Sequence, residues 1–255
     1  MYLKEKIQTG YKAVGCMMRV VRNSTAALLA GQAGVDFLML DCEHGSYDYE
    51  TLHDLFIALQ LNGVDGFVRV PELSKGHISR VLDCGAVGVM IPMIDSVEQA
   101  KLAVKYSKYK PVGGRGFIQA NGYNEYDPQG KSHTQIMEEQ NKRVITIAQI
   151  ETKNAIDHIE EIAAVEGIDA LLIGQSDLSI SHDLPGDFKN SVLQEAVRKV
   201  GNACKNQGKI FGLATEFPNF ESYLPLVGII LQGTDMGFIK QGMKKLADFR
   251  DEKNA

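Results

Sequence analysis

Eight short apolar segments, separated by stretches of helical or loop character, run through the whole sequence. They span residues 13–18, 36–41, 66–70, 87–92, 144–151, 169–174, 209–214 and 228–233. Segments that are apolar on both faces are typical of parallel strands covered by helices. Eight of them in one chain predict a (β/α)8 barrel, with a doubly wound open sheet as the alternative. The barrel is favoured because no Gly-x-Gly-x-x-Gly turn follows the first segment.

The chain has 255 residues, of which 44% are hydrophobic, enough for a buried core. We expect one barrel domain over residues 1–255, with an inserted loop at about 110–132 between the fourth and fifth strands. The loop contains Gly-Gly-Arg-Gly, Asn-Gly and Asp-Pro, which mark turns. It could bring backbone amides and Arg115 to an anion, or it could pack over the barrel or at a subunit contact.

Composition excludes several classes of partner. Charged residues make up 23% of the chain and the net charge is −5, so a nucleic-acid partner is not expected. No apolar run is long enough for a membrane span, and the first residues do not resemble a signal peptide, so we expect a cytoplasmic protein. The four cysteines have no Cys-x-x-Cys spacing, which argues against a zinc knot or a disulfide scaffold.

Polar residues follow four of the predicted strands, at the end of a barrel where active sites are found. They lie in Asp41–Gly45, at Arg69, in Gln149–Glu151 and in Gly174–Asp177. The first, seventh and eighth strands end with less ionisable material. The sequence therefore predicts that charge gathers on one side of the barrel mouth.

Glu151 and Asp177 end two consecutive strands, which lie side by side in a β-α-β unit. Two carboxylates are too few to cage Ca²⁺ but suit Mg²⁺ or Mn²⁺, which keep waters and take further ligands from a substrate. The alternative is that each carboxylate caps the helix that follows it. Gln149 shares a strand face with Glu151 and should point into the same opening.

Arg69 and His44 are candidates for catalysis. An unpaired charge at the end of the apolar strand would be costly, so Arg69 must meet an anionic substrate or pair with Asp41 or Glu43. His44 is the histidine placed at a strand end, and an imidazole titrates near neutral pH. No predicted strand carries a lysine in its inner or C-terminal half, which favours metal chemistry over a Schiff base.

Six motifs, in order along most of the chain, resemble the metal-dependent (class II) pyruvate aldolases of the HpcH/HpaI type, which include 4-hydroxy-2-oxo-heptanedioate and 2-keto-3-deoxy sugar acid aldolases. They are Asp41–Gly45, Arg69–Pro71, Gly88–Met93 with the preceding Asp83, Pro111–Gly116, Gln149–Thr152 and Gly174–Ser179.

The resemblance implies a modified (β/α)8 TIM barrel in which Glu151 and Asp177 bind a divalent metal ion, Mg²⁺, Mn²⁺ or Co²⁺. It further implies that Gln149 and the backbone around Ser176 and Asp177 hold pyruvate. His44 resembles the general base and Arg69 the enolate stabiliser.

Asp83 matches the aspartate that makes this histidine more basic. Asp83 precedes the fourth strand, however, so it could act across a subunit contact, since family members are typically hexamers built as trimers of dimers.

The resemblance predicts reversible cleavage of a 4-hydroxy-2-oxo acid to pyruvate and an aldehyde, through a metal-bound pyruvate enolate. A CoA-ester lyase of the citrate lyase β-subunit type and a non-catalytic oxo-acid-binding barrel are the alternatives. The chain departs from the pattern at Gln175, where family members often have proline, and at 117–127. These departures concern the aldehyde half of the site.

Overall fold

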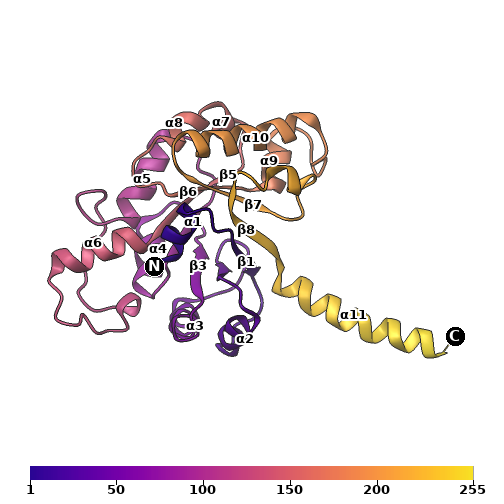
Figure 1. Cartoon of the computed structure of the whole chain (residues 1–255), viewed down its shortest axis with the longest axis horizontal. Coiled ribbons are helices and arrows are strands. Elements are labelled where there is room, and N and C mark those ends of the chain that lie inside the picture. The colour runs from indigo at the N-terminus through magenta and orange to yellow at the C-terminus, as the bar shows by residue number, and fades with distance from the viewer. Residues whose placement is uncertain (255) are drawn as a thin grey trace.

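The computed structural model describes residues 1–254, and its eight parallel strands form a closed barrel (Figure 1). The strands are β1 (Ala13–Met18), β2 (Phe37–Asp41), β3 (Asp65–Arg69), β4 (Gly88–Ile91), β5 (Ile145–Ile150), β6 (Ala170–Ile173), β7 (Ile210–Ala214) and β8 (Val227–Thr234). Each strand pairs with the next, and β1 pairs with β8 through Ala13 opposite Ile229. The predicted (β/α)8 barrel and all eight predicted strands are confirmed.

The strands are apolar on both faces because one face lies in the barrel interior and the other packs against helices. One face of β5 points into the barrel and the other lies beneath helices, so all six of its residues are buried. The same holds for the five residues of β2 and the four of β6. The polar residues at the ends of these strands are therefore the first that can meet solvent or a ligand.

Helices connect the strands and cover the outside of the barrel. They are α1 (Leu3–Gln8), α2 (Thr25–Ala33), α3 (Tyr49–Leu61), α4 (Lys75–Asp83), α5 (Val97–Ser107), α6 (His133–Arg143), α7 (Lys153–Asp157), α8 (Ile159–Ala163), α9 (Gln175–Ser181), α10 (Ser191–Asn206) and α11 (Asp235–Asn254). In α10, the buried residues Leu193, Val197, Val200 and Cys204 recur every three or four positions. This spacing puts them on the face that packs on the barrel.

Between α5 and α6 the chain forms a long loop that contains only the short 3₁₀ helix η1 (Gly122–Asn124). The loop lies toward the N-terminal ends of the strands, because it comes before β5. Its Arg115 is buried and pairs with Asp83 at the end of α4. The loop therefore contributes to the face opposite the barrel mouth.

The last helix, α11, extends away from the barrel (Figure 1). Its large apolar residues Met236, Phe238, Ile239, Met243, Leu246 and Phe249 are exposed. No helix was expected after residue 233, so α11 is a feature that the sequence pattern did not predict. Among the described residues, no helix combines the length and apolar character that crossing a membrane requires.

Candidate active site

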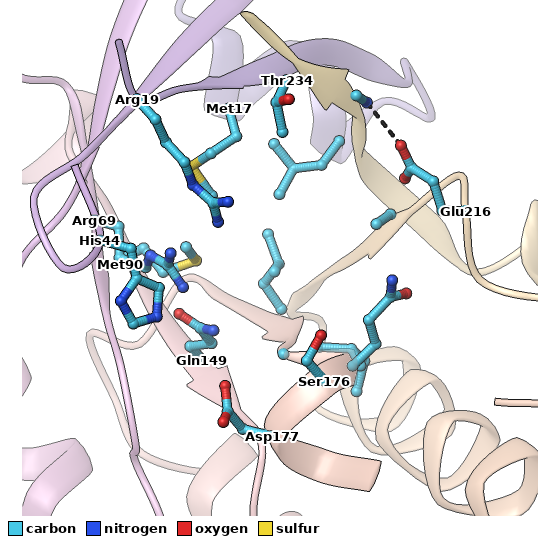
Figure 2. A pocket seen from close by; sticks show the side chains of 17 residues that line it. Met17, Arg19, His44, Arg69, Met90, Gln149, Ser176, Asp177, Glu216 and Thr234 are labelled. Atoms are coloured by element: carbon cyan, nitrogen blue, oxygen red, sulfur yellow. Dashed lines mark hydrogen bonds between the residues drawn. The ribbon is translucent and has the colours of Figure 1, made fainter. Parts of the chain in front are cut away.

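A cavity of about 320 Å³ opens at the C-terminal ends of the barrel strands (Figure 2). Its walls come from the ends of all eight strands or from the residues that follow them. The predicted site residues that line it are His44, Arg69, Gln149, Ser176 and Asp177. The structure thus brings together residues up to 133 positions apart in sequence (177 − 44), because parallel strands of a barrel all end at the same mouth.

Glu151 does not itself line this cavity, but it is hydrogen-bonded to Gln149, which does. Its carboxylate is 2% exposed and accepts two hydrogen bonds, from Gln149 Nε2 at 2.5 Å and from the backbone N–H of Met93 at 2.7 Å. Gly174 permits this arrangement, because a Cβ there would come within 2.0 Å of Glu151 Oε2. The glycine at the end of β6 is therefore part of the site.

The charge of Glu151 is poorly compensated by the protein. Burial raises its pKa from an ordinary value of 4.5 to about 7. The hydrogen bond from Met93 and the charge of Arg69 oppose this shift, but the negative charges of Glu43 and Asp177 add to it. The site is thus short of positive charge beside Glu151.

The helix-cap alternative for these two carboxylates is not what the structure shows. Thr152, not Glu151, caps α7 by accepting a hydrogen bond from the backbone N–H of Ala155. Helix α9 begins after Gly174, so Asp177 lies in its first turn and not at the end of β6 as expected, and no side chain caps this helix. Both carboxylates are therefore available for another partner.

The oxygen atoms around Glu151 fit a divalent cation. Gln149 Oε1 is buried and has no hydrogen-bond partner among residues 1–254. The carboxylate of Asp177 points toward the side chain of Gln149 (Figure 2). Two carboxylates and an amide oxygen are hard donors of the kind that Mg²⁺ and Mn²⁺ prefer, with waters or substrate completing the shell. Within the described residues, no three His, Cys, Asp or Glu side chains group as a metal site.

Asp41, at the end of β2, organises the opposite wall. Its fully buried carboxylate accepts hydrogen bonds from Arg69 Nε at 2.9 Å, from the Arg69 terminal nitrogen Nη2 at 2.6 Å and from Arg19 Nε at 2.8 Å. The backbone N–H groups of Glu43 and His44 donate to the same carboxylate. Burial by itself would raise the pKa of Asp41, but Arg69 and Arg19 hold it below its ordinary value.

Arg69 forms the ion pairs with carboxylates that were one of the two expectations from the sequence. It pairs with Asp41 and also with Glu43, where Nη1 lies 2.9 Å from Oε2. It nevertheless lines the cavity (Figure 2). Its charge therefore faces the space where a ligand would bind while its position is fixed by two carboxylates.

His44 is placed at the rim of the cavity. Its side chain is 57% exposed, and its Nε2 lies 4.0 Å from Glu43 Oε2. The backbone of the residue is held by Asp41, as described above. The imidazole is thus positioned near Arg69 with access to solvent, as a group that exchanges protons requires (Figure 2).

Asp83 is not brought to His44 within the chain. It ends α4, on the side of the barrel where strands begin, and it accepts hydrogen bonds from Arg115 and from Asn121 of the long loop. A role for Asp83 at the predicted site would need the contact across subunits that the sequence analysis allowed.

The expectation that charge gathers on one side of the mouth is wrong. Arg19 follows β1 and Glu216 follows β7, and both line the cavity. Asp235, after β8, is buried and accepts hydrogen bonds from the backbone N–H groups of Arg19, Val20 and Val21. The signal was present in the sequence as an ionisable residue within two positions of each of these strand ends.

Known proteins resemble this chain over nearly its whole length. A 5-keto-4-deoxy-D-glucarate aldolase from Escherichia coli K12 is 31% identical over 237 residues, which is 92% of this chain and 91% of the relative. A 4-hydroxy-4-methyl-2-oxoglutarate aldolase from Chaetomium globosum is 35% identical over 215 residues, 82% of this chain and 77% of the relative.

Solved structures of other proteins also resemble this chain. An HpcH/HpaI aldolase from Desulfitobacterium hafniense is 29% identical, with a TM-score of 0.91 over 99% of this chain and 97% of that one. A citrate lyase beta subunit from M. tuberculosis, complexed with oxaloacetate and magnesium, is 14% identical with a TM-score of 0.55, over 89% of this chain and 93% of that one, and shares the fold alone.

The sequence profile of the HpcH/HpaI aldolase/citrate lyase family matches residues 19–232. This range contains the six motifs that carried the resemblance, and the prediction of an enzyme, a carbon–carbon lyase, is confirmed. The chain belongs to the HpcH/HpaI aldolase/citrate lyase family.

Proposed function

We propose that this enzyme is a class II aldolase that reversibly cleaves a 4-hydroxy-2-oxo acid to pyruvate and an aldehyde. The proposal is carried by one observation: the buried carboxylate of Glu151, which feels the negative charge of Asp177, accepts a hydrogen bond from Gln149, and Gln149 lines one cavity together with Asp177, His44 and Arg69. A 2-oxo acid bound beside Glu151 and Asp177 together with a cation would have its reactive carbons toward His44.

Glu151 and Asp177 would hold the divalent cation. The cation supplies positive charge to the oxygens of the 2-oxo acid and to the enolate that cleavage creates. Gln149 lies at the end of β5, Glu151 follows that strand, and Asp177 lies in the first turn of α9. Mg²⁺, Mn²⁺ and Co²⁺ are the candidates for the ion.

The chain's own residues would carry the proton and the charge. His44 accepts the proton of the C4 hydroxyl as the C3–C4 bond breaks and the aldehyde departs. The bonding electrons move toward the C2 oxygen, where the guanidinium of Arg69 stabilises the developing negative charge. A proton delivered to C3 then gives pyruvate.

Pyruvate binding would use the first turn of α9 as well. The backbone N–H groups of Ser176 and Asp177 have no intrahelical partner, because they lie within the first turn of the helix. They can donate to the pyruvate carboxylate, and Gln149 closes the same side of the cavity. The cavity lining contains no lysine among the described residues, so no residue there offers an imine route.

Exchange of the pyruvate methyl protons tests this function without knowledge of the aldehyde. In D₂O, the enzyme with Mg²⁺, Mn²⁺ or Co²⁺ is expected to replace the methyl protons of pyruvate by deuterium, because enolisation is the half-reaction that precedes carbon–carbon bond formation. Proton NMR measures the loss of the methyl signal. Addition of EDTA should stop the exchange. Exchange that EDTA does not affect, or no exchange with any of the metals, would contradict the proposal.

A homo-oligomer is part of the same proposal, with a hexamer built as a trimer of dimers as the expected state. The apolar residues Met236, Ile239, Met243 and Leu246 of α11 are spaced three, four and three positions apart and form one exposed stripe. Such a stripe on a helix that leaves its own barrel supports contact with another copy of the chain.

Charge placed in this stripe should break the oligomer. We expect Met243→Lys with Leu246→Lys to shift the enzyme to a smaller species, because two ammonium groups would be buried without partners. Analytical ultracentrifugation measures the change. Gln241→Lys, on the other side of α11, is the matched control and should keep the mass of the wild type. A monomeric wild type, or an unchanged mass in the double variant, would argue against the assignment of α11.

A further inference from the structure

Met93, two residues after β4, has a backbone conformation that residues other than glycine rarely adopt. Its φ is 56°, in the left-handed region, where the Cβ of an L-residue crowds the following carbonyl oxygen. Packing of the side chain does not account for this conformation, because the side chain is 50% exposed. A strained backbone persists where the surrounding structure imposes it, and such positions cluster at functional sites.

The residues that follow Met93 hold the strained turn in place. Ile94 is fully buried, and its backbone N–H donates to the carbonyl oxygen of Gln149 at 3.3 Å. The side chain of Asn154, in α7, donates to the carbonyl oxygen of Asp95 at 2.8 Å. The segment after β4 is therefore attached both to β5 and to the helix that follows β5.

The turn directs the backbone N–H of Met93 to Glu151. This N–H donates to Oε1 at 2.7 Å, while Gln149 Nε2 donates to Oε2 at 2.5 Å. The absence of a Cβ at Gly174 leaves just enough room for Oε2 on the side of β6. Each carboxylate oxygen has two lone pairs, so each keeps one for a cation while the hydrogen bonds fix the plane of the carboxylate.

We propose that Met93 is a positioning residue for the cation, through its left-handed backbone and not through its side chain. The N–H at this position sets the orientation of the Glu151 carboxylate and thereby the affinity of the site for a divalent ion. This inference rests on the proposed function, which assigns Glu151 to the cation. The side chain of Met93 does not line the cavity, so the role belongs to the backbone.

The affinity for Mn²⁺, measured without turnover, tests the role of the backbone conformation. Free Mn²⁺ gives an electron paramagnetic resonance signal that is lost on binding, and titration of this signal yields Kd. Met93→Ile should raise Kd about tenfold, because a branched Cβ disfavours positive φ and moves the N–H away from Glu151. Met93→Gly should keep the Kd of the wild type, because glycine adopts this conformation readily. A role for the side chain would predict the opposite order, since isoleucine is much closer to methionine in size.

A second variant tests the N–H itself. Incorporation of the α-hydroxy acid of methionine at position 93 replaces the N–H by an ester oxygen and keeps the side chain. Its Kd for Mn²⁺ should rise at least about tenfold, and this variant decides the question if circular dichroism shows that Met93→Ile does not fold. Leu102→Ile is the matched control, because it places a branched Cβ at an exposed residue of α5 with ordinary helical geometry. It should bind Mn²⁺ as the wild type does.

Two results would overturn the role of Met93. One is an unchanged Kd in the ester variant, and the other is the same Kd for Met93→Ile and Met93→Gly. If the wild type still binds Mn²⁺ and exchanges the pyruvate methyl protons, the proposed function stands in either case. A wild type that binds no Mn²⁺ and does not exchange these protons would overturn both proposals.

Discussion

Replacing Glu151 by glutamine is expected to lower kcat for metal-dependent aldol cleavage by at least about a thousandfold. A Lewis-acidic cation contributes several kcal/mol to the stabilisation of the enolate, and each 1.4 kcal/mol corresponds to about tenfold in rate. Glutamine keeps the size of the side chain and an oxygen acceptor for the Met93 N–H, although its amide nitrogen cannot accept the hydrogen bond from Gln149 Nε2. The loss would therefore report the carboxylate and its charge, because the size of the side chain is unchanged. Asp177→Ala should lose turnover in the same way while the barrel stays folded, whereas normal turnover by that variant would refute the metal assignment.

Glu151→Gln should also change how the stability of the protein depends on pH. Without a cation, burial raises the pKa of Glu151 to about 7 from 4.5, so the folded protein binds a proton that the unfolded chain releases at lower pH. The contribution of Glu151 to stability is full below about pH 4.5 and is lost as pH rises through about 7. The shift corresponds to a loss on the order of 3 kcal/mol.

Urea unfolding in EDTA at pH 5.5 and pH 8 measures this effect. The metal-free wild type should lose stability between the two, and Glu151→Gln should lose less, because glutamine does not ionise. Asp183→Asn removes an exposed carboxylate after α9 and should behave as the wild type. The same pH dependence in wild type and Glu151→Gln would show that the buried charge is not the cause.

The predicted site residues that line the cavity share a simple property: each lies near or just after the C-terminal end of a strand. His44, Gln149 and Asp177 could be placed at one mouth because a parallel barrel with sequential strands leaves no other position for strand ends. The hydrogen-bond register between the strands was not needed to predict that these residues lie at one mouth. The sequence was therefore sufficient for the fold and for much of the candidate site.

Arg19 shows what the sequence could not supply. It stands three residues before Arg22, in the same short connection after β1, and the two are equivalent in local pattern. Only the fold distinguishes them, because Asp41 and Asp235, distant in sequence, anchor Arg19 and leave Arg22 exposed. Asp41 is 22 residues from Arg19 and Asp235 is 216 residues away, so neither contact follows from a local periodic pattern.

Helix α11 was not predicted from the sequence, and Asp83 was predicted at a site where the structure does not place it. The apolar spacing in α11 was visible, but a stripe that packs on nothing in its own chain does not belong to the β-α pattern that guided the assignment. Asp83 matched a motif, and its position before β4 rather than after it follows from the topology. Neither feature could therefore be placed from the pattern of strands and helices alone.

Replacing Asp41 by asparagine is expected to destabilise the enzyme by about 3–5 kcal/mol, as is typical when one partner of a buried ion pair loses its charge. Asp41 is fully buried and accepts hydrogen bonds from Arg69 and Arg19. Asparagine keeps one acceptor oxygen but cannot compensate either guanidinium, so Arg69 would remain buried with Glu43 alone. The midpoint of denaturant unfolding should fall. Asp251→Asn, which removes an exposed carboxylate beside Arg250, should unfold as the wild type does.

A double-mutant cycle separates the pair from general damage to the barrel. Arg69→Met should also be destabilising, since it leaves the Asp41 carboxylate with one arginine instead of two. If the two charges stabilise each other, the double variant should be more stable than the sum of the single losses predicts, by about 0.5–3 kcal/mol. Strict additivity, or an unchanged midpoint in Asp41→Asn, would show that the carboxylate does not hold this wall together. Loss of turnover in these variants would then have to come from Arg69 itself, because its position would no longer depend on Asp41.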